Sequence, residues 1–437
     1  MKTVADIAAT LQGYDPQALS VPDVNAFLAQ LVSPVEDTEQ AGIFDALDRV
    51  LASDLVSPLN VPPHDNSAMD GYAFDGAALS AGPAPLVLRV VGTAFAGTAW
   101  QGRAGPGDCV KVMTGAIMPA GLDTVVPLEL VQLAGDQVHV PAGALQRGDN
   151  RRFAGEDIRA GSVALARGTR LTPAALGLAA SLGIAQLTVV RRLRVAYFST
   201  GDEILSVGEP PREGAVYDSN RYTVFGLLRR MGIDVLDLGV VPDAPAQLEA
   251  AFTHAAAQAD AIITSGGVSM GEADYTKAMM HKLAGDVGGV AFWRIAMRPG
   301  RPMAVGRIAR PHAPPGAISE AKSASGQCGT YANSSQNESA ILFGLPGNPV
   351  AVMVTFLAFV RPALLQMMGN TTAAPPLLRA RSLEAMRKKP GRTEYQRGTV
   401  STAPDGTLQV RTTGNQGSGV LSSMVQGNGL IVLHHGQ

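Results

Sequence analysis

Residues 261–285 read "AIITSGGVSMGEADYTKAMMHKLAG", and this stretch decides the fold of the central part of the chain. It begins with apolar, β-branched residues, which predict a buried strand, and it ends in a segment typical of an amphipathic helix. Two adjacent glycines and several hydroxyl groups lie between them, followed by the carboxylates Glu272 and Asp274. A strand, a glycine loop and a helix in succession indicate one unit of a parallel α/β sheet.

The same alternation extends to both sides of this stretch. Strand-like and helix-like segments follow one another from "RVAYFST" at 194–200 to the long apolar helix that closes the segment near residue 368. This order predicts a mostly parallel α/β domain over 191–371, with helices on both faces of the sheet. Ligands of such sheets bind beyond the carboxyl ends of the strands, so the loops there are the first place to look for a site.

The rest of the chain has a different texture and predicts a multidomain α/β protein. A helical or linker domain is expected from the helical spacing of segments such as "FDALDRVLASDL", 44–55, and a β-rich inserted domain from short strands separated by glycine and proline. The end of the chain predicts a small C-terminal β-barrel. The expected boundaries are a flexible N-terminus at 1–20, the helical or linker domain at 21–60 plus 155–190, the inserted domain at 61–154, a flexible insertion at 309–339 and the C-terminal domain at 372–437.

Composition excludes several classes of function. The formal charge of −2 over 437 residues gives no signature of nucleic-acid binding. Cys109 and Cys328 are the only cysteines, which excludes a disulfide framework or a cysteine zinc site and predicts a reducing, cytoplasmic location. The apolar run at 174–190 divides into a helix and a strand, so we expect no membrane span there, and the first residues do not resemble a signal peptide.

Polar groups follow several of the predicted strands. Glycine and hydroxyl groups in these loops are suited to hold an anion through backbone N–H groups, whereas carboxylates would repel a phosphate unless a divalent cation lies between them. We therefore interpret Glu203, Asp243 and Asp274 as acids around Mg²⁺ and regard three arginines as the cationic complement of an oxyanion. These arginines are Arg294, Arg298 and Arg301.

Eight motifs in one order resemble those of the molybdopterin molybdenumtransferase family of the MoeA type. They are "DNSAMDGYA", "MTGAIMPAGLDTVV", "GEDI", "STGDE", "YDSNR", "TSGGVSMGEADYTK", "RPGRP" and "GLPGNPV". The resemblance extends from about Val24 to the end of the chain, apart from the insertion at 309–339. It implies an elongated cytoplasmic homodimer of four domains that transfers molybdenum from molybdate to adenylylated molybdopterin, with Mg²⁺ and release of AMP.

Site residues follow from these motifs one by one. The resemblance implies catalytic roles for Asp70, Thr114, Asp157, Glu203, Asp243 and Asp274. The residues expected to bind the substrate are Ser67, Thr200, Gly201, Ser265, Gly266, Gly267, Ser269, Arg294, Arg298, Arg301, Pro346, Gly347 and Asn348. The three arginines stand where the family commonly has lysine, and they keep the positive charge that oxyanion binding needs. The resemblance also implies that the partner subunit's inserted domain contributes to each site.

Two other functions remain open from the sequence. A molybdopterin adenylyltransferase would need only the α/β domain, and a gephyrin-like scaffold would keep the fold while serving to anchor partners. The retained acids and the blocks on either side of the α/β domain favour the molybdenum transferase. Its expected partners are a second copy of the chain, and beyond it a molybdopterin adenylyltransferase and proteins that mature molybdenum enzymes. We expect neither nucleic acid nor a membrane as a partner.

Overall fold

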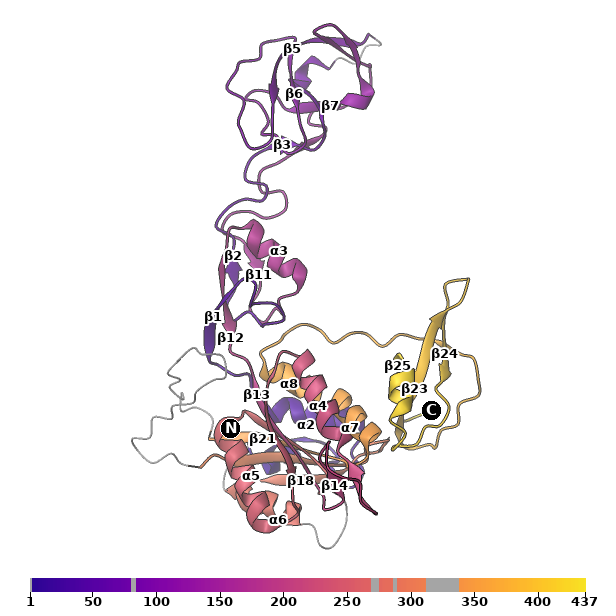
Figure 1. Ribbon diagram of the computed structural model, residues 1–437. Coiled ribbons are helices and arrows are strands. Elements are labelled where there is room, and N and C mark those ends of the chain that lie inside the picture. The colour runs from indigo at the N-terminus through magenta and orange to yellow at the C-terminus, as the bar shows by residue number, and fades with distance from the viewer. Residues whose placement is uncertain (1, 80–83, 269–274, 286–288, 312–337) are drawn as a thin grey trace, which may run out of the picture.

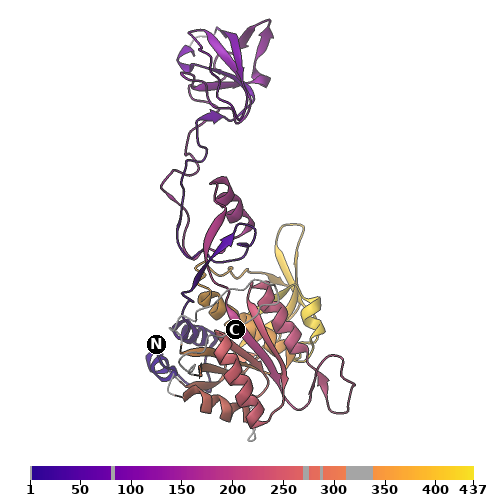
Figure 2. The ribbon, with the colours of Figure 1, turned by 60° about the vertical axis from the view of Figure 1, so that its left-hand side comes forward.

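The computed structural model shows an elongated molecule made of several separate parts. It describes residues 2–79, 84–268, 275–285, 289–311 and 338–437. A β-domain stands at the far end of a slender stalk, well away from the α/β domain and the C-terminal domain (Figure 1). Figure 2 shows the same separation from a second direction, so it does not come from the choice of view.

A six-stranded sheet forms the centre of the α/β domain, as the alternation of strands and helices predicts. Its strand order is β16-β13-β17-β21-β20-β18. The first four strands of this order are parallel, and the last two run antiparallel to their neighbours. Their bounds are β13 Arg194–Thr200, β16 Asp234–Val241, β17 Ala261–Ser265, β18 Val290–Arg294, β20 Pro302–Ala309 and β21 Ser339–Leu345.

Helices cover both faces of this sheet because neighbouring residues of each strand point to opposite sides. In β13, Val195 and Tyr197 belong to the core beneath one set of helices, whereas Ala196 and Phe198 belong to the core beneath the other. The first set consists of α1 Val4–Thr10, α2 Val21–Leu31, α4 Ser219–Arg230, α7 Pro349–Thr355 and α8 Arg361–Met367. The second set consists of α5 Pro245–Gln258 and α6 Tyr275–Ala284.

The helical segment Pro349–Met367 is long and apolar enough to cross a membrane by length and composition alone. It comprises α7, a π-helical turn over Phe356–Val360, and α8. Most of this segment is buried inside the protein, where Phe356, Phe359 and Leu364 join the same core as α2. Its apolar composition is explained by packing in the core of the α/β domain.

The expectation of a flexible N-terminus at 1–20 is wrong. Thr3 and Asp6 form a reciprocal capping box that starts α1, and Ser20 and Asp23 form a second one that starts α2. Val4 and Ile7 are buried in the core of the α/β domain. The first helices therefore belong to that domain, and the capping pairs are the sequence signal that could have indicated them.

The stalk is built from two segments of chain that run side by side. The pairs β1 Thr38–Gly42 with β12 Gln186–Val190, and β2 Leu55–Val56 with β11 Val163–Leu165, are antiparallel, and α3 Pro173–Ser181 packs beside them. The helix predicted over 44–55 is absent from this described part of the chain. Residues 43–48 form turns, and Asp48 has a φ of 62°, a backbone conformation that no α-helix contains.

The inserted domain carries a six-stranded sheet of order β7-β4-β6-β5-β9-β8, as its short β-branched runs predict. The side chain of Cys109 is buried in this sheet, and burial raises the pKa of its thiol to about 12, so the thiol stays protonated and inert. The six strands are β4 Gly71–Phe74, β5 Leu86–Ala94, β6 Asp108–Val112, β7 Thr124–Pro127, β8 Gln132–Ala134 and β9 Gln137–Val140. A further pair, β3 Asn66–Ser67 with β10 Arg151–Arg152, lies at the end of the domain that faces the stalk (Figure 1).

The C-terminal domain is an open sheet and not the small barrel that the sequence predicted. Its order is β19-β23-β24-β22, with β25 pairing to β23, and these described pairs do not close into a ring. The hairpin predicted at "APDGT" does join β23 to β24. The bounds are β19 Met297–Arg298, β22 Arg381–Ser382, β23 Thr393–Thr402, β24 Leu408–Thr412 and β25 Gly429–Leu433. Since β19 follows the α/β strand β18, this sheet is joined to the α/β domain.

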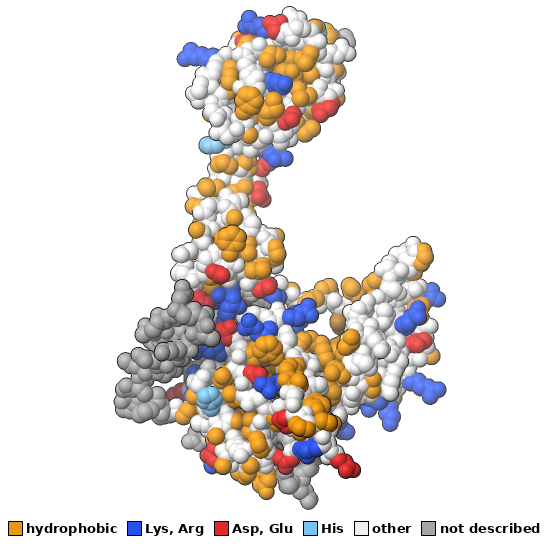
Figure 3. Space-filling model, viewed as in Figure 1, with side chains coloured by type: hydrophobic (Ala, Val, Ile, Leu, Met, Phe, Trp, Pro, Cys, Tyr) orange, Lys and Arg blue, Asp and Glu red, His pale blue; other side chains and the backbone are white. Residues whose placement is uncertain are grey.

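Arg191 ties the stalk to the α/β domain. Its guanidinium makes two hydrogen bonds of 2.8 Å to the carboxylate of Asp260 and one of 2.9 Å to that of Asp37. Asp260 is almost fully buried and also accepts the backbone N–H of Arg194. Lys and Arg side chains gather where the stalk meets the α/β domain (Figure 3). Removing Arg191 would leave a buried carboxylate without its main counter-ion.

The Arg191 contact predicts a large loss of stability on substitution. We expect Arg191→Met to lower the free energy of unfolding by about 3 kcal/mol, because the buried Asp260 carboxylate loses its bidentate partner. Urea unfolding followed by tryptophan fluorescence measures this. Arg192→Met is the matched control, since Arg192 donates to the carbonyl of Gly232, and it should cost only about 1 kcal/mol. Equal losses in the two variants would contradict the assignment.

Candidate functional site

The carboxyl ends of the parallel strands open into a cavity of about 650 Å³. The loops after β13, β16, β17 and β21 each reach it, as expected for the open edge of a parallel sheet. The residues from these strand ends and loops that line the cavity are Thr200, Gly201, Glu203, Asp243, Gly266, Gly267, Val268, Pro346, Gly347 and Asn348. Apart from Val268, all of these were predicted as site residues from the sequence.

Gly266 brings the loop after β17 close to the loop after β13. Its φ is +90°, and a Cβ built on it would lie 2.3 Å from the carbonyl oxygen of Thr200. No side chain fits there without moving one of the two loops, and the backbone conformation itself favours glycine. The glycine therefore serves the close approach of two backbones that together line the cavity.

Two hydroxyl residues that were predicted to bind substrate have different surroundings. Thr200 is buried and lines the cavity, and its Oγ1 has no hydrogen-bond partner among the described residues. An unpaired buried hydroxyl next to a cavity is suited to hydrogen-bond a ligand. Ser265 was also predicted to bind substrate, but its Oγ lies 2.7 Å from the hydroxyl of Tyr197 and 3.1 Å from that of Ser199. Its side chain bonds inside the protein, and Ser265 is not among the residues that line the cavity; its role in binding substrate stays a prediction.

Two of the three predicted cation ligands line the same cavity. They are Glu203, after β13, and Asp243, after β16. Asp243 accepts a hydrogen bond of 3.3 Å from the hydroxyl of Thr276, in the first turn of α6. No group of three or more His, Cys, Asp or Glu that could hold a metal occurs among the described residues. Two carboxylates beside an anion cradle still suit Mg²⁺, which keeps water and phosphate oxygens as its other ligands.

Arginines line the same cavity as the carboxylates. Arg298 and Arg301 line it, as predicted, on the segment that carries Pro299 and Gly300. Arg294 does not line it; this residue ends β18, where it pairs with Pro302, so its predicted role in binding is not supported by the geometry. The "RPGRP" segment thus supplies two guanidinium groups to the cavity rather than three.

Sequence reasoning missed the contribution of the C-terminal domain. Arg392 and Ser418 of that domain line the cavity. Arg392 makes hydrogen bonds of 2.6 and 2.8 Å to Glu394, which lower the pKa of that buried carboxyl although burial alone would raise it. The basic run "KKPGRTEYQR" at 388–397 was the available signal, but only the pairing of β19 with β23 brings it to the cavity.

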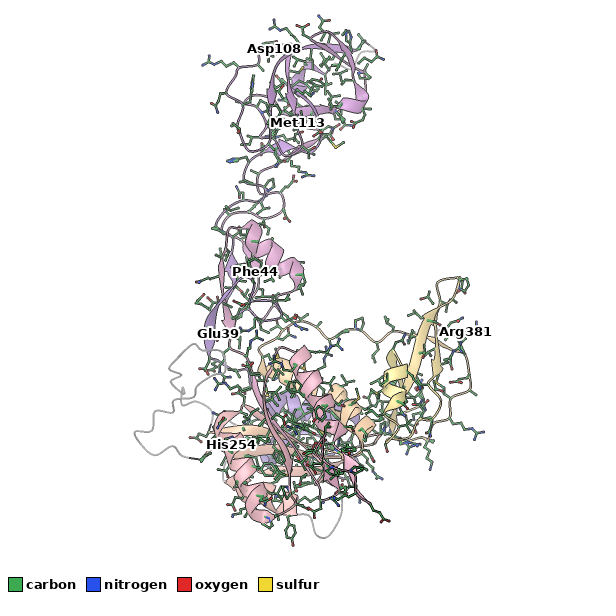
Figure 4. All side chains as sticks on the ribbon, viewed as in Figure 1. Glu39, Phe44, Asp108, Met113, His254 and Arg381 are labelled. Atoms are coloured by element: carbon green, nitrogen blue, oxygen red, sulfur yellow. The ribbon has the colours of Figure 1, made fainter. Side chains whose placement is uncertain are left out.

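The remaining predicted site residues lie in the inserted domain and stalk, outside this cavity. Asp70 accepts hydrogen bonds from the Thr114 backbone N–H (2.7 Å) and hydroxyl (2.8 Å), and these lower the pKa of the Asp70 carboxyl. Ser67 is buried and donates to the carbonyl of Met69. Asp157 is exposed and lies between β10 of the inserted domain and β11 of the stalk. Figure 4 labels Met113, the neighbour of Thr114, at the stalk-facing end of the inserted domain.

The structure therefore separates two halves of the predicted site within one chain. Asp70 and Thr114 form a compact acid–hydroxyl pair in the inserted domain, whereas the glycine loops, the two other acids and the arginines share the cavity of the α/β domain. Ser269 and Asp274, the remaining predicted residues, lie outside the described residues.

Comparison with known proteins identifies the family. The family described as "MoeA N-terminal region (domain I and II)" matches residues 19–183, "Probable molybdopterin binding domain" matches 196–366, and "MoeA C-terminal region (domain IV)" matches 379–437. A protein of Haemophilus influenzae named molybdopterin molybdenumtransferase is 40% identical over 93% of this chain and 92% of its own length. The chain belongs to the molybdopterin molybdenumtransferase family.

Other members of this family are similar over most of their length. A Bacillus subtilis protein with the same name is 32% identical over 92% of this chain and 86% of its own. The solved structure of a molybdopterin biosynthesis MoeA protein from Pyrococcus horikoshii aligns with a TM-score of 0.74 at 25% identity, covering 96% of both chains. The resemblance to the molybdopterin molybdenumtransferase family that the motifs indicated is confirmed.

The close approach at Gly266 predicts a specific effect on stability. We expect Gly266→Ala to lower the free energy of unfolding by about 2 kcal/mol, because the methyl group would collide with the Thr200 carbonyl in an unfavourable backbone conformation. Gly347→Ala is the control, since nothing lies within 4 Å of its built Cβ, and it should be nearly neutral. Thermal unfolding of both variants measures the difference. A neutral Gly266→Ala would show that the two loops do not meet as described.

Proposed function

We propose that this chain transfers molybdenum from molybdate to adenylylated molybdopterin, with Mg²⁺-dependent release of AMP. The observation that carries the proposal is the cavity at the strand ends, where glycine loops, two carboxylates and three arginines meet in a chain whose relatives are named molybdopterin molybdenumtransferase. The molybdopterin adenylyltransferase alternative is not favoured, because the matched N-terminal and C-terminal regions lie on either side of the α/β domain. No observation here favours a scaffold role.

The groups around the cavity suit a substrate with both a phosphoanhydride and an oxyanion. Backbone N–H groups of the glycine loops and the hydroxyl of Thr200 would hold phosphate oxygens. The guanidinium groups of Arg298 and Arg301 would bind molybdate, a dianion, through paired N–H donors. Cleavage of a phosphoanhydride depends mainly on positioning and on neutralising the charge on phosphate oxygens, and these residues provide both.

Glu203 and Asp243 would hold the Mg²⁺ ion, and Asp274 is proposed as a third ligand from its motif. Bound there, the ion would neutralise charge on the phosphate oxygens that leave with AMP. The hydroxyl of Thr276 orients Asp243 by its hydrogen bond to Oδ1. The carboxylates thus need not touch the phosphate, which resolves the conflict between acids and an anion cradle.

We further propose that the protein works as a cytoplasmic homodimer in which the partner's inserted domain completes each cavity. The support is the position of the Asp70–Thr114 pair, which stands at the far end of the stalk from the cavity of its own chain (Figure 4). An exposed acid that accepts two hydrogen bonds and lies outside the cavity at the strand ends of its own described chain suits a role in a second subunit's site. A molybdopterin adenylyltransferase, as supplier of the adenylylated substrate, and proteins that mature molybdenum enzymes remain proposed partners.

The transferase reaction can be tested directly. Purified protein supplied with adenylylated molybdopterin, Mg²⁺ and molybdate should release AMP and retain molybdenum in the pterin product, and chelation of Mg²⁺ should stop both. We expect Asp243→Asn to slow AMP release ~10²-fold through lost charge neutralisation, and Asp274→Asn to act in the same direction.

Asp237→Asn provides the matched control for this assay. Asp237 lies on β16, the strand that precedes Asp243, but it pairs with Arg221 and is not among the residues that line the cavity, so AMP release should be unchanged. Absence of AMP release from the unmodified protein under every metal condition would exclude the proposed reaction.

The shared site predicts complementation between two inactive variants. Asp70→Asn and Asp243→Asn, mixed at equal amounts, should form half mixed dimers, each with one intact site of two, which gives about a quarter of the full activity. If Asp70 instead serves the cavity of its own chain, every site in a mixed dimer carries one substitution. No activity would then return, so AMP release by coexpressed variants decides between the two arrangements.

A further inference from the structure

The buried side chain of Asn220 connects helix α4 to the wall of the cavity. It belongs to the "YDSNR" segment, to which the proposed reaction assigns no role. Its Nδ2 donates a hydrogen bond of 2.7 Å to the carbonyl oxygen of Gly347 and lies 3.5 Å from the Oγ of Ser265. Asn220 is only 8% exposed, and it does not itself line the cavity, whereas Gly347 and Asn348 do.

The contact with Gly347 fixes the direction of one peptide group. The carbonyl of Gly347 and the N–H of Asn348 belong to the same peptide unit, which is trans because the described cis bonds lie elsewhere. In a planar trans peptide these two groups point in opposite directions. Since the carbonyl points inward to Asn220, the Asn348 N–H points away from the interior, on the side where both residues line the cavity. No described residue accepts a hydrogen bond from this N–H.

A buried network holds Asn220 in place. Tyr197, Ser199 and Ser265 bond to one another through their hydroxyl groups at 2.7 to 3.1 Å, and Ser265 lies beside the Asn220 amide. Burial raises the pKa of Tyr197, so its hydroxyl keeps its proton. The network joins β13, β17 and α4 behind the cavity wall. A rigid support of this kind is what keeps a binding group in one orientation.

We propose that Asn220 is a positioning residue that turns the Asn348 backbone N–H into the cavity as a donor for a phosphate oxygen of the substrate. The inference rests on the proposed function, because the phosphate belongs to the adenylylated substrate. The side-chain amide of Asn220 is needed because its N–H donates the hydrogen bond that the Gly347 carbonyl accepts. The unpaired hydroxyl of buried Thr200 at the same cavity is an independent sign that this wall receives a polar ligand.

Asn220→Asp tests the donor without changing the size of the side chain. A carboxylate would repel the Gly347 carbonyl, so the peptide loses its fixed orientation. We expect the KM for adenylylated molybdopterin to rise at least tenfold, with a smaller change in kcat for AMP release. AMP binding, measured by calorimetry, should weaken by a similar factor. Asn220→Ala, which removes the donor without adding charge, should act in the same direction if the aspartate variant does not fold.

Gln366→Glu is the matched control for the change from amide to carboxylate. Gln366 Nε2 also donates to backbone carbonyls, those of Ala29 and Val32, but it lies outside the cavity. This variant should lose stability while its KM stays unchanged. Hydrogen exchange gives a readout that a purely structural role would not move: AMP should protect the amides of residues 346–352 in the unmodified protein and much less in Asn220→Asp.

The outcomes separate the two proposals. In one outcome, the unmodified protein releases AMP, but Asn220→Asp has the same KM and the same protection by AMP as Gln366→Glu. That result overturns the role of Asn220 and leaves the proposed function standing. Unmodified protein that neither binds nor releases AMP overturns the proposed function and this inference with it. A raised KM in Asn220→Asp and Asn220→Ala but not in Gln366→Glu supports the inference.

Discussion

Four parallel strands end at the same edge of one sheet, and the whole cavity depends on that alignment. Because β16, β13, β17 and β21 run in one direction, the loops after them emerge together, and each brings a different kind of group. Carboxylates come from the loops after β13 and β16, and backbone N–H groups come from those after β17 and β21. The chain supplies opposite charges from separate loops, so that a cation and an anion can be held side by side.

Much of this could be predicted from the sequence because the signals are local. The strand at 194–200 and the helix Pro245–Gln258 follow from the spacing of their apolar residues. The acids Glu203 and Asp243 follow from their position directly after strands. Local signals also existed where the prediction failed: the capping pair of Thr3 and Asp6 marked a helix that we had expected to be a flexible end.

Other features of the site and stalk have long-range causes that a sequence pattern does not contain. Ser265 was assigned to the substrate, but its strand lies in register with Ser199, and the two hydroxyls meet inside the protein. Arg392 and Ser418 were missed because β19 and β23, far apart in the chain, must pair before those residues reach the cavity. The helix expected over 44–55 fails at Asp48, where the stalk requires a left-handed turn.

The two antiparallel segments of the stalk have a mechanical consequence. The inserted domain is held at the end of a long arm whose base is clamped by the contacts of Arg191 with Asp37 and Asp260 (Figure 1). Such an arm is a lever: a small rotation at its base becomes a large displacement at its tip. The reach of the Asp70 carboxylate therefore depends on the ion-paired joint at the opposite end of the stalk as well as on its own surroundings.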